Sequence, residues 1–169
     1  TQYLTKDGLK GKRIGIEKKK YSNPVLNELL EKAINIMKQK GAEIVEVEYL
    51  DQINENGNAE FEVMKFEFKY GLDKYLSSAN TKVKSLQDVI AFNKKNEATD
   101  MPTFKQETLE SSQEKTGLDS KEYLNAITKS HNGTKNIIDK VLTDNKLDAI
   151  SGLTMGPACS IDTIYGDRW

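Results

Sequence analysis

The sequence predicts an α/β fold in which a few mainly parallel strands, starting with a β–α–β unit, are covered by several helices. Residues 11–16 are predicted to form a short strand after a turn, because Ile14 and Ile16 alternate with other residue types. An amphipathic helix follows over residues 24–39, and residues 43–50 alternate apolar with charged side chains. A strand, a helix and a strand with short connections imply a parallel pair.

The first helix carries signals at both of its ends. Asn23 can cap it, and Pro24 suits its first turn because the N–H that proline lacks is not needed there. Gly41 suits the position after the helix, where the backbone often adopts the left-handed conformation. The expected packing partners are the helix residues Leu26, Leu30, Ala33 and Met37 and the sheet residues Ile14, Ile16 and Val45.

The middle of the chain is predicted to be helical, and residues 61–76 carry apolar side chains on two faces. A helix that is apolar on two faces is buried between layers or lines a cavity. We therefore expect one stripe to face this chain's own core and the other to face something else. The first stripe contains Phe61, Met64, Phe68, Leu72, Tyr75 and Leu76, and the second contains Val63, Phe66 and Tyr70.

Further helices and one more strand follow. Ser85–Asp88 resembles a capping box and predicts a short helix. The predicted order after it is a loop, a helix, a capped longer helix that Gly133 kinks or splits, and a third strand. We expect a single α/β domain over residues 1–169 because no repeat or low-complexity linker interrupts them. The predicted ranges are 93–103 for the loop, 104–115 and 119–141 for the helices, and 147–150 for the strand.

The composition argues against several classes of protein. The formal net charge is -1 and only two arginines are present, whereas nucleic-acid-binding proteins are usually basic and rich in arginine. One cysteine and one histidine allow no internal disulfide and no cysteine–histidine metal site. No apolar run is long enough to span a membrane, and we expect a cytoplasmic protein by default. We also expect no metal and no cofactor. The hydrophobic fraction of 37% hints that the chain packs against something else.

Three features invite a catalytic interpretation. Ser112 and Lys115 have the Ser-x-x-Lys spacing of one class of serine hydrolases, but their segment is charged and offers no buried face to lower the pKa of the lysine. His131 has no evident catalytic partner and is expected to be a partly buried packing residue. Cys159 lacks a neighbouring base, and we expect a small half-buried side chain there.

Three blocks of sequence in fixed order nevertheless resemble the amidase-signature family, and together they cover nearly the whole chain. The second block is the most specific one. The first block is residues 8–16 with Asn23–Pro24 and residues 41–45, the second is residues 85–93 with residues 101–104 and Gln106–Glu107, and the third is residues 147–150 with residues 154–158, Ile161–Asp162 and Gly166–Asp167.

The resemblance implies an amidase that hydrolyses a carboxamide C–N bond with a Ser–cis-Ser–Lys triad. In that family a Gly/Ser-rich loop upstream of the first block supplies the nucleophile, and no serine pair here is flanked by glycines. No catalytic residue is therefore carried over, and we expect a fragment truncated at both ends that is inactive alone. Leu153 stands where many relatives have proline, so this turn departs from the family's pattern.

The resemblance also implies where substrate would bind. The regions that match residues 61–76 and 154–159 border the acyl side of the substrate cleft in the family. The substrate-binding candidates are Glu62, Met64, Phe66, Thr154 and Cys159. The implied partner is a small-molecule amide, and self-association through exposed surface is a further expectation. A different class of protein stays open beside this one, namely a self-contained, non-catalytic α/β interaction or ligand-binding module.

Overall fold

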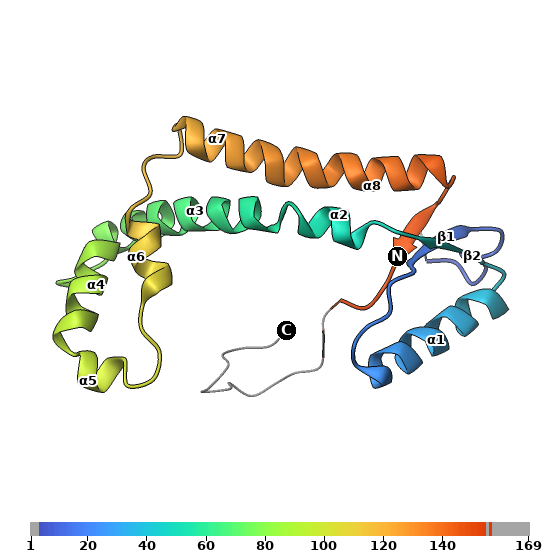
Figure 1. Ribbon diagram of the computed structural model, residues 1–169, viewed down its shortest axis with the longest axis horizontal. Coiled ribbons are helices and arrows are strands. Elements are labelled where there is room, and N and C mark those ends of the chain that lie inside the picture. Colours follow the sequence, from blue (N-terminus) through green and yellow to red (C-terminus); the bar gives the residue numbers. More distant parts are fainter. Residues whose placement is uncertain (1–3, 155, 157–169) are drawn as a thin grey trace. The chain divides into compact units, whose positions relative to one another are not determined.

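The computed structural model describes residues 4–154 and residue 156. They divide into two compact units, which we call the sheet unit and the helical unit (Figure 1). The sheet unit contains residues 4–55 together with the described residues from 134 onward, and the helical unit is Asn56–Gly133. The predicted α/β fold is confirmed, whereas the single domain over residues 1–169 stays a prediction.

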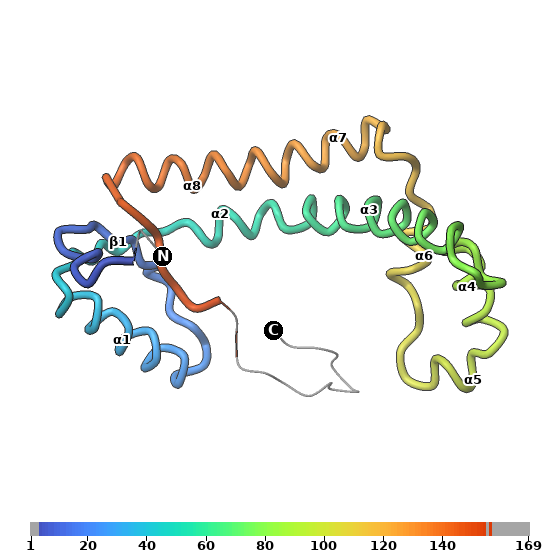
Figure 2. Tube along the Cα trace, turned by 180° about the vertical axis from the view of Figure 1, so that it is seen from behind, coloured from blue at the N-terminus to red at the C-terminus, as the bar shows by residue number. Residues whose placement is uncertain are grey.

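The sheet unit is built on three parallel strands in the order β2-β1-β3. The central strand pairs on both sides, since Ile14 lies opposite Ile44 in β2 and opposite Ala149 in β3. The helix α1 connects β1 to β2 and lies along the sheet (Figures 1 and 2). The elements are β1 (Arg13–Glu17), α1 (Pro24–Gln39), β2 (Glu43–Val47), α2 (Leu50–Asn54), α8 (Gly133–Asp144) and β3 (Ala149–Ser151).

The helix α1 has the predicted bounds, and its end signals act as expected. The side-chain oxygen of Asn23 accepts a hydrogen bond of 2.9 Å from the backbone N–H of Val25. Pro24 occupies the first turn. Gly41 has a φ of 88°, which side-chain-bearing residues rarely adopt, so glycine suits the turn from α1 into β2.

The predicted packing between helix and sheet is wrong for two residues, Ala33 and Val45. Leu30 and Met37 do pack against the core of Ile14, Ile16 and Ala42, but Ala33 is exposed. Val45 lies on the other face of the sheet, because it pairs with Gly15 while Ile44 pairs with Ile14. Paired residues of neighbouring strands point to the same side. Ile44 therefore occupies the place predicted for Val45.

The predicted strand over residues 43–50 ends early, at Val47. The carboxylate of Glu17 accepts hydrogen bonds from the backbone N–H groups of Tyr49 and Leu50, at 2.9 and 3.0 Å. Burial raises the pKa of Glu17, but these bonds and one from the N–H of Lys19 outweigh it, so the net shift of the pKa is downward. A carboxylate from β1 thus stabilises the start of α2.

The helical unit packs its helices around the long helix α3. Serine side chains cap α4 and α7 as predicted, because Ser85 accepts from the N–H of Asp88 and Ser120 accepts from the N–H of Tyr123. The elements are α3 (Gly57–Ser78), α4 (Leu86–Lys95), α5 (Glu97–Asp100), α6 (Glu107–Gln113), α7 (Lys121–Ile127) and the π-helix η1 (Thr128–Asn132). No helix in the described part of the chain is long and apolar enough to cross a membrane.

Three predicted boundaries in this unit are wrong. The loop predicted over residues 93–103 contains the end of α4 and all of α5. The helix predicted from residue 104 begins only at Glu107, since the side chain of Gln106 is buried and donates a hydrogen bond of 3.2 Å to the carbonyl of Ile90. That helix also ends at Gln113 rather than at residue 115. The expected irregularity at Gly133 is present, since the π-helical turn η1 ends at Asn132 and α8 begins at Gly133.

Candidate functional site

Phe66 is the central side chain of the helical unit. Only 1% of its surface is exposed, and its ring centre lies 5.6 Å from that of Tyr123 at a tilt of 56°. The ammonium of Lys115 lies 5.4 Å from the centre of the same ring, a distance at which a cation is attracted to an aromatic face. Phe66 therefore anchors α3 against α7 and the segment before α7.

Glu62 is held between two ammonium groups. Its two carboxylate oxygens lie 2.6 Å from Lys65 Nζ and 2.5 Å from Lys115 Nζ. Hydrogen bonds from Lys115 and Lys65 lower the pKa of Glu62, and the bond to Glu62 raises the pKa of Lys115. Near neutral pH the carboxylate is charged and both of its oxygens already have a partner.

An apolar groove of about 200 Å³ lies between α3 and α6, and we call it the α3–α6 groove. Its apolar side chains from α3 are largely exposed, at 46% for Phe61, 57% for Met64 and 43% for Phe68. Two of the polar side chains beside it already have partners, since Lys65 is paired with Glu62 and Ser112 donates to the carbonyl of Thr108. The groove is lined by Phe61, Met64, Lys65, Phe68, Thr108, Leu109 and Ser112.

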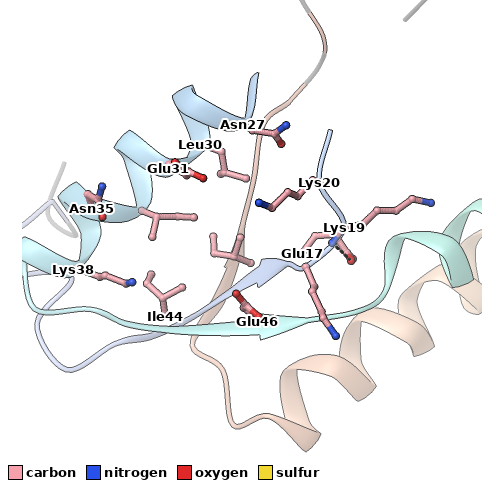
Figure 3. A pocket seen from close by; sticks show the side chains of 13 residues that line it. Glu17, Lys19, Lys20, Asn27, Leu30, Glu31, Asn35, Lys38, Ile44 and Glu46 are labelled. Carbon is pink, nitrogen blue, oxygen red and sulfur yellow. Dashed lines mark hydrogen bonds between the residues drawn. The ribbon is translucent and has the colours of Figure 1, made fainter. Parts of the chain in front are cut away.

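The sheet unit has a separate hollow of about 350 Å³ between α1 and the strands (Figure 3). Leu30 of α1 and Ile44 of β2 point toward one another across it, and Lys20 and Lys38 enter it from opposite ends. Asn27 also lines it, but its amide holds the neighbouring loop through the backbone of Tyr21. Among the described residues that line this hollow there is no serine, cysteine or histidine, so they bring together no nucleophile and base for acyl transfer.

Comparison with known proteins gives a consistent result. The chain is 33% identical, over 161 residues, to an Arabidopsis thaliana protein named as a probable amidase, a match that covers 92% of this chain and 30% of that protein. The peptide amidase of Stenotrophomonas maltophilia has a TM-score of 0.75 and 31% identity, over 88% of this chain and 31% of its own. An amidase family protein from Bacillus anthracis has a TM-score of 0.69 and 27% identity, over 88% and 29%. No family model matches the chain.

Sequence and fold thus point to the same group of proteins over most of the chain. Over most of its length the chain is similar to amidases, in agreement with its resemblance to the amidase-signature family. It spans about 30% of the length of the Arabidopsis relative and 31% of the peptide amidase. The resemblance that the three sequence blocks carried is confirmed.

The Ser-x-x-Lys spacing in this amidase segment does not form an activated pair. Ser112 is 1% exposed, and its hydroxyl donates a hydrogen bond of 2.7 Å to the carbonyl of Thr108. Lys115 is paired with Glu62, which raises the pKa of the ammonium, whereas a general base near neutral pH needs a lowered one. The two residues therefore serve packing and charge pairing.

The remaining candidates belong to different parts of the chain. Thr154 lies exposed beyond β3 in the sheet unit, whereas Glu62, Met64 and Phe66 belong to the helical unit. Cys159 lies outside the described residues. His131 is exposed in η1, so its predicted packing role is wrong, and its Nδ1 lies 3.0 Å from Asn132 Oδ1. Within the described residues no cluster of three metal-ligating side chains occurs.

Sequence reasoning missed two contributors to the region around Glu62. Lys115 was considered only as part of a catalytic spacing, and Leu109 of α6 was not considered at all, although it lines the groove. Both lie more than 30 positions beyond the end of α3 along the chain, and the spacing of residues within one helix cannot predict such a contact. The apolar stripe at Phe61, Met64 and Phe68 was the available signal, because it indicated a face that α3 does not bury in its own core.

Proposed function

We propose that this chain is a part of an amidase that hydrolyses a carboxamide C–N bond by Ser–cis-Ser–Lys chemistry, and that it supplies scaffold and part of the substrate cleft. One observation carries the proposal, namely the match of 88% of the chain to a peptide amidase at 31% identity and a TM-score of 0.75. Because the chain covers only 31% of that enzyme, the activity belongs to a longer polypeptide in this proposal.

The proposed chemistry needs groups that the described residues do not provide. A serine hydroxyl must attack the amide carbonyl carbon and lose its proton, through the serine of the cis peptide, to a lysine. A proton must then pass to the departing amine, and water must cleave the acyl-serine ester. The one Ser–Lys spacing that attracted notice has a buried serine and an ion-paired lysine. We propose that the triad lies outside residues 4–154 and that this chain alone is inactive.

Two of the predicted substrate-binding residues fit a supporting role. Phe66 is buried and Glu62 is bonded to two lysines, so both would hold the shape of the cleft rather than contact the amide. Thr154 and Cys159 stay predictions as substrate contacts, and so does the cytoplasmic location. A small-molecule amide is the proposed substrate class, and the peptide amidase complex with the competitive inhibitor chymostatin supplies a probe.

The experiment compares two purified proteins on one panel of carboxamides that includes a chromogenic anilide. The first protein is this 169-residue chain, and the second is the longest polypeptide encoded by the same reading frame. Turnover by the longer polypeptide alone supports the proposal. Turnover by the 169-residue chain that is lost in Ser112→Ala or Lys115→Ala contradicts the proposed role of a non-catalytic part. A reading frame that encodes nothing longer contradicts the proposal as well and favours a self-contained module.

A further inference from the structure

We propose that the α3–α6 groove is a docking surface for another part of the same amidase polypeptide, rather than a site for substrate or for a second copy of the chain. The proposal rests on the proposed function, since it needs a polypeptide of amidase length. It changes the role of Met64, which the family resemblance had suggested as a substrate contact, to that of an interface residue.

The size and extent of the surface favour a protein occupant. The groove has a volume of about 200 Å³, below the roughly 300–1,000 Å³ that is usual for a small-molecule pocket. The exposed stripe does not stop at the groove, because Tyr75 further along α3 is 68% exposed. From Phe61 to Tyr75 a helix rises roughly 21 Å, at about 1.5 Å per residue. A continuous apolar face of this length suits side chains of another helix or strand.

The chemistry of the lining argues against an amide ligand. Small-molecule sites orient their ligands with a few well-placed polar groups. Here the ammonium of Lys65 is bound to Glu62 at 2.6 Å and lies 4.7 Å from the ring centre of Phe61. The hydroxyl of Ser112 donates to Thr108 at 2.7 Å. With these two groups already bonded, the groove offers mainly apolar contact, and Thr108 is the other polar side chain that lines it.

The relatives favour a part of the same polypeptide as the occupant. The peptide amidase matches 88% of this chain with only 31% of its own length, so its remaining residues are available to cover surfaces of the matched part. Large exposed apolar patches mark protein–protein or membrane contacts or ligand-binding grooves, and the bonded polar groups of this groove favour a protein contact here. On the other face of α3, Phe66 is only 1% exposed in the helical unit's own core, although Tyr70 further along is 55% exposed. Further residues of a longer polypeptide would therefore bury apolar surface by packing into the groove.

The test measures how fast a thiol reagent reacts with a cysteine placed in the groove. Met64→Cys is introduced into a Cys159→Ser background, in this chain and in the longest polypeptide of the same reading frame, and the peptide that contains residue 64 is followed by mass spectrometry. Lys74→Cys is the matched control, because Lys74 is an exposed residue of α3 away from the stripe. Phe68→Cys is a second groove position, to be used if Met64→Cys perturbs folding.

We expect labelling at position 64 to be at least about 100-fold slower in the longer polypeptide than in this chain, with no inhibitor present, while position 74 reacts equally fast in both. Equal rates at position 64 overturn the docking surface. Protection that appears only with a saturating inhibitor such as chymostatin overturns it in favour of substrate. Protection in this chain alone that rises with protein concentration overturns it in favour of a second copy.

Amide turnover of the same samples separates this inference from the proposed function. An active longer polypeptide with a fast-reacting residue 64 contradicts only the docking surface. An inactive longer polypeptide with a protected residue 64 contradicts only the proposed amidase activity and leaves the docking surface supported.

Discussion

The two faces of α3 carry similar side chains and have opposite environments. Phe66 is 1% exposed beneath Tyr123 and Lys115, whereas Phe61 and Phe68 on the other face are 46% and 43% exposed. Aromatic character therefore does not decide which face is buried. Phe66 becomes core where α3 meets Tyr123 of α7 and Lys115, whereas Phe61 and Phe68 beside the short helix α6 stay open.

The largest expected effect comes from truncating the buried face. Phe66→Ala should lower the free energy of unfolding by about 3–5 kcal/mol, because it removes a buried ring and leaves a cavity. Phe61→Ala is the matched control on the exposed face and should change it by less than about 1 kcal/mol. Urea denaturation followed by circular dichroism gives both values. Equal losses for the two variants would show that the two faces are buried alike.

An intermediate effect is expected where a side chain is only half-buried. Leu30 packs against the sheet core without being fully enclosed, so Leu30→Ala should lower the free energy of unfolding by about 1–2 kcal/mol, less than for a fully buried leucine. Leu29 is 54% exposed on the same helix, and Leu29→Ala is the control with almost no effect. If Leu29→Ala proves the more costly substitution, the orientation of α1 on the sheet is wrong.

A smaller, pH-dependent effect is expected at the ion pair beside Phe66. Glu62→Gln should lower the free energy of unfolding by about 1 kcal/mol near neutral pH, since the pair is partly exposed and screened by solvent. The pKa of Glu62 is lowered from its usual value of 4.5, so its stabilising contribution is present above that value and is lost as the pH falls through the lowered pKa. The pKa of Lys115 is raised from 10.5, so its contribution is lost only as the pH rises through the raised pKa.

The measurement is the difference between the unfolding free energies of the parent chain and Glu62→Gln across pH. We expect the largest difference between roughly pH 5 and pH 10, with a decline toward both ends. A difference that stays constant into strong acid would mean that the carboxylate contributes through packing rather than through its charge.

The smallest expected change in stability belongs to the exposed face itself. Met64→Ser should change the free energy of unfolding by less than about 0.5 kcal/mol, because the side chain is 57% exposed. It should nevertheless reduce the binding of a hydrophobic dye to the folded chain, since it removes apolar surface from the groove. A marked destabilisation would place Met64 in the core instead.

Local signals predicted the elements of the fold better than their mutual packing. Asn23, Pro24 and Gly41 act within a few residues of the helix they delimit, and the predicted bounds of α1 are correct. Val45 was assigned to the wrong face, because the face of a strand depends on its register with a partner strand. The strand end at Val47 depends on the carboxylate of Glu17, which lies on a different strand.

The candidate site was predictable only in part for the same reason. The two stripes of α3 follow from helical periodicity, and the exposure of Phe61, Met64 and Phe68 agrees with the expectation that one stripe faces away from the chain's own core. The pairing of Glu62 with Lys115 joins α3 to a segment that lies 53 positions further along the chain, so periodicity could not reveal it.

The central claim is the proposal that this chain is part of an amidase whose nucleophile lies outside the present chain. A covalent serine-directed inhibitor, followed by peptide mapping of the longest polypeptide of the reading frame, tests it directly. We expect a single labelled serine outside the 169-residue sequence, and no label when the 169-residue chain is treated alone. Label on Ser112, or on any other serine of this chain, would contradict the claim.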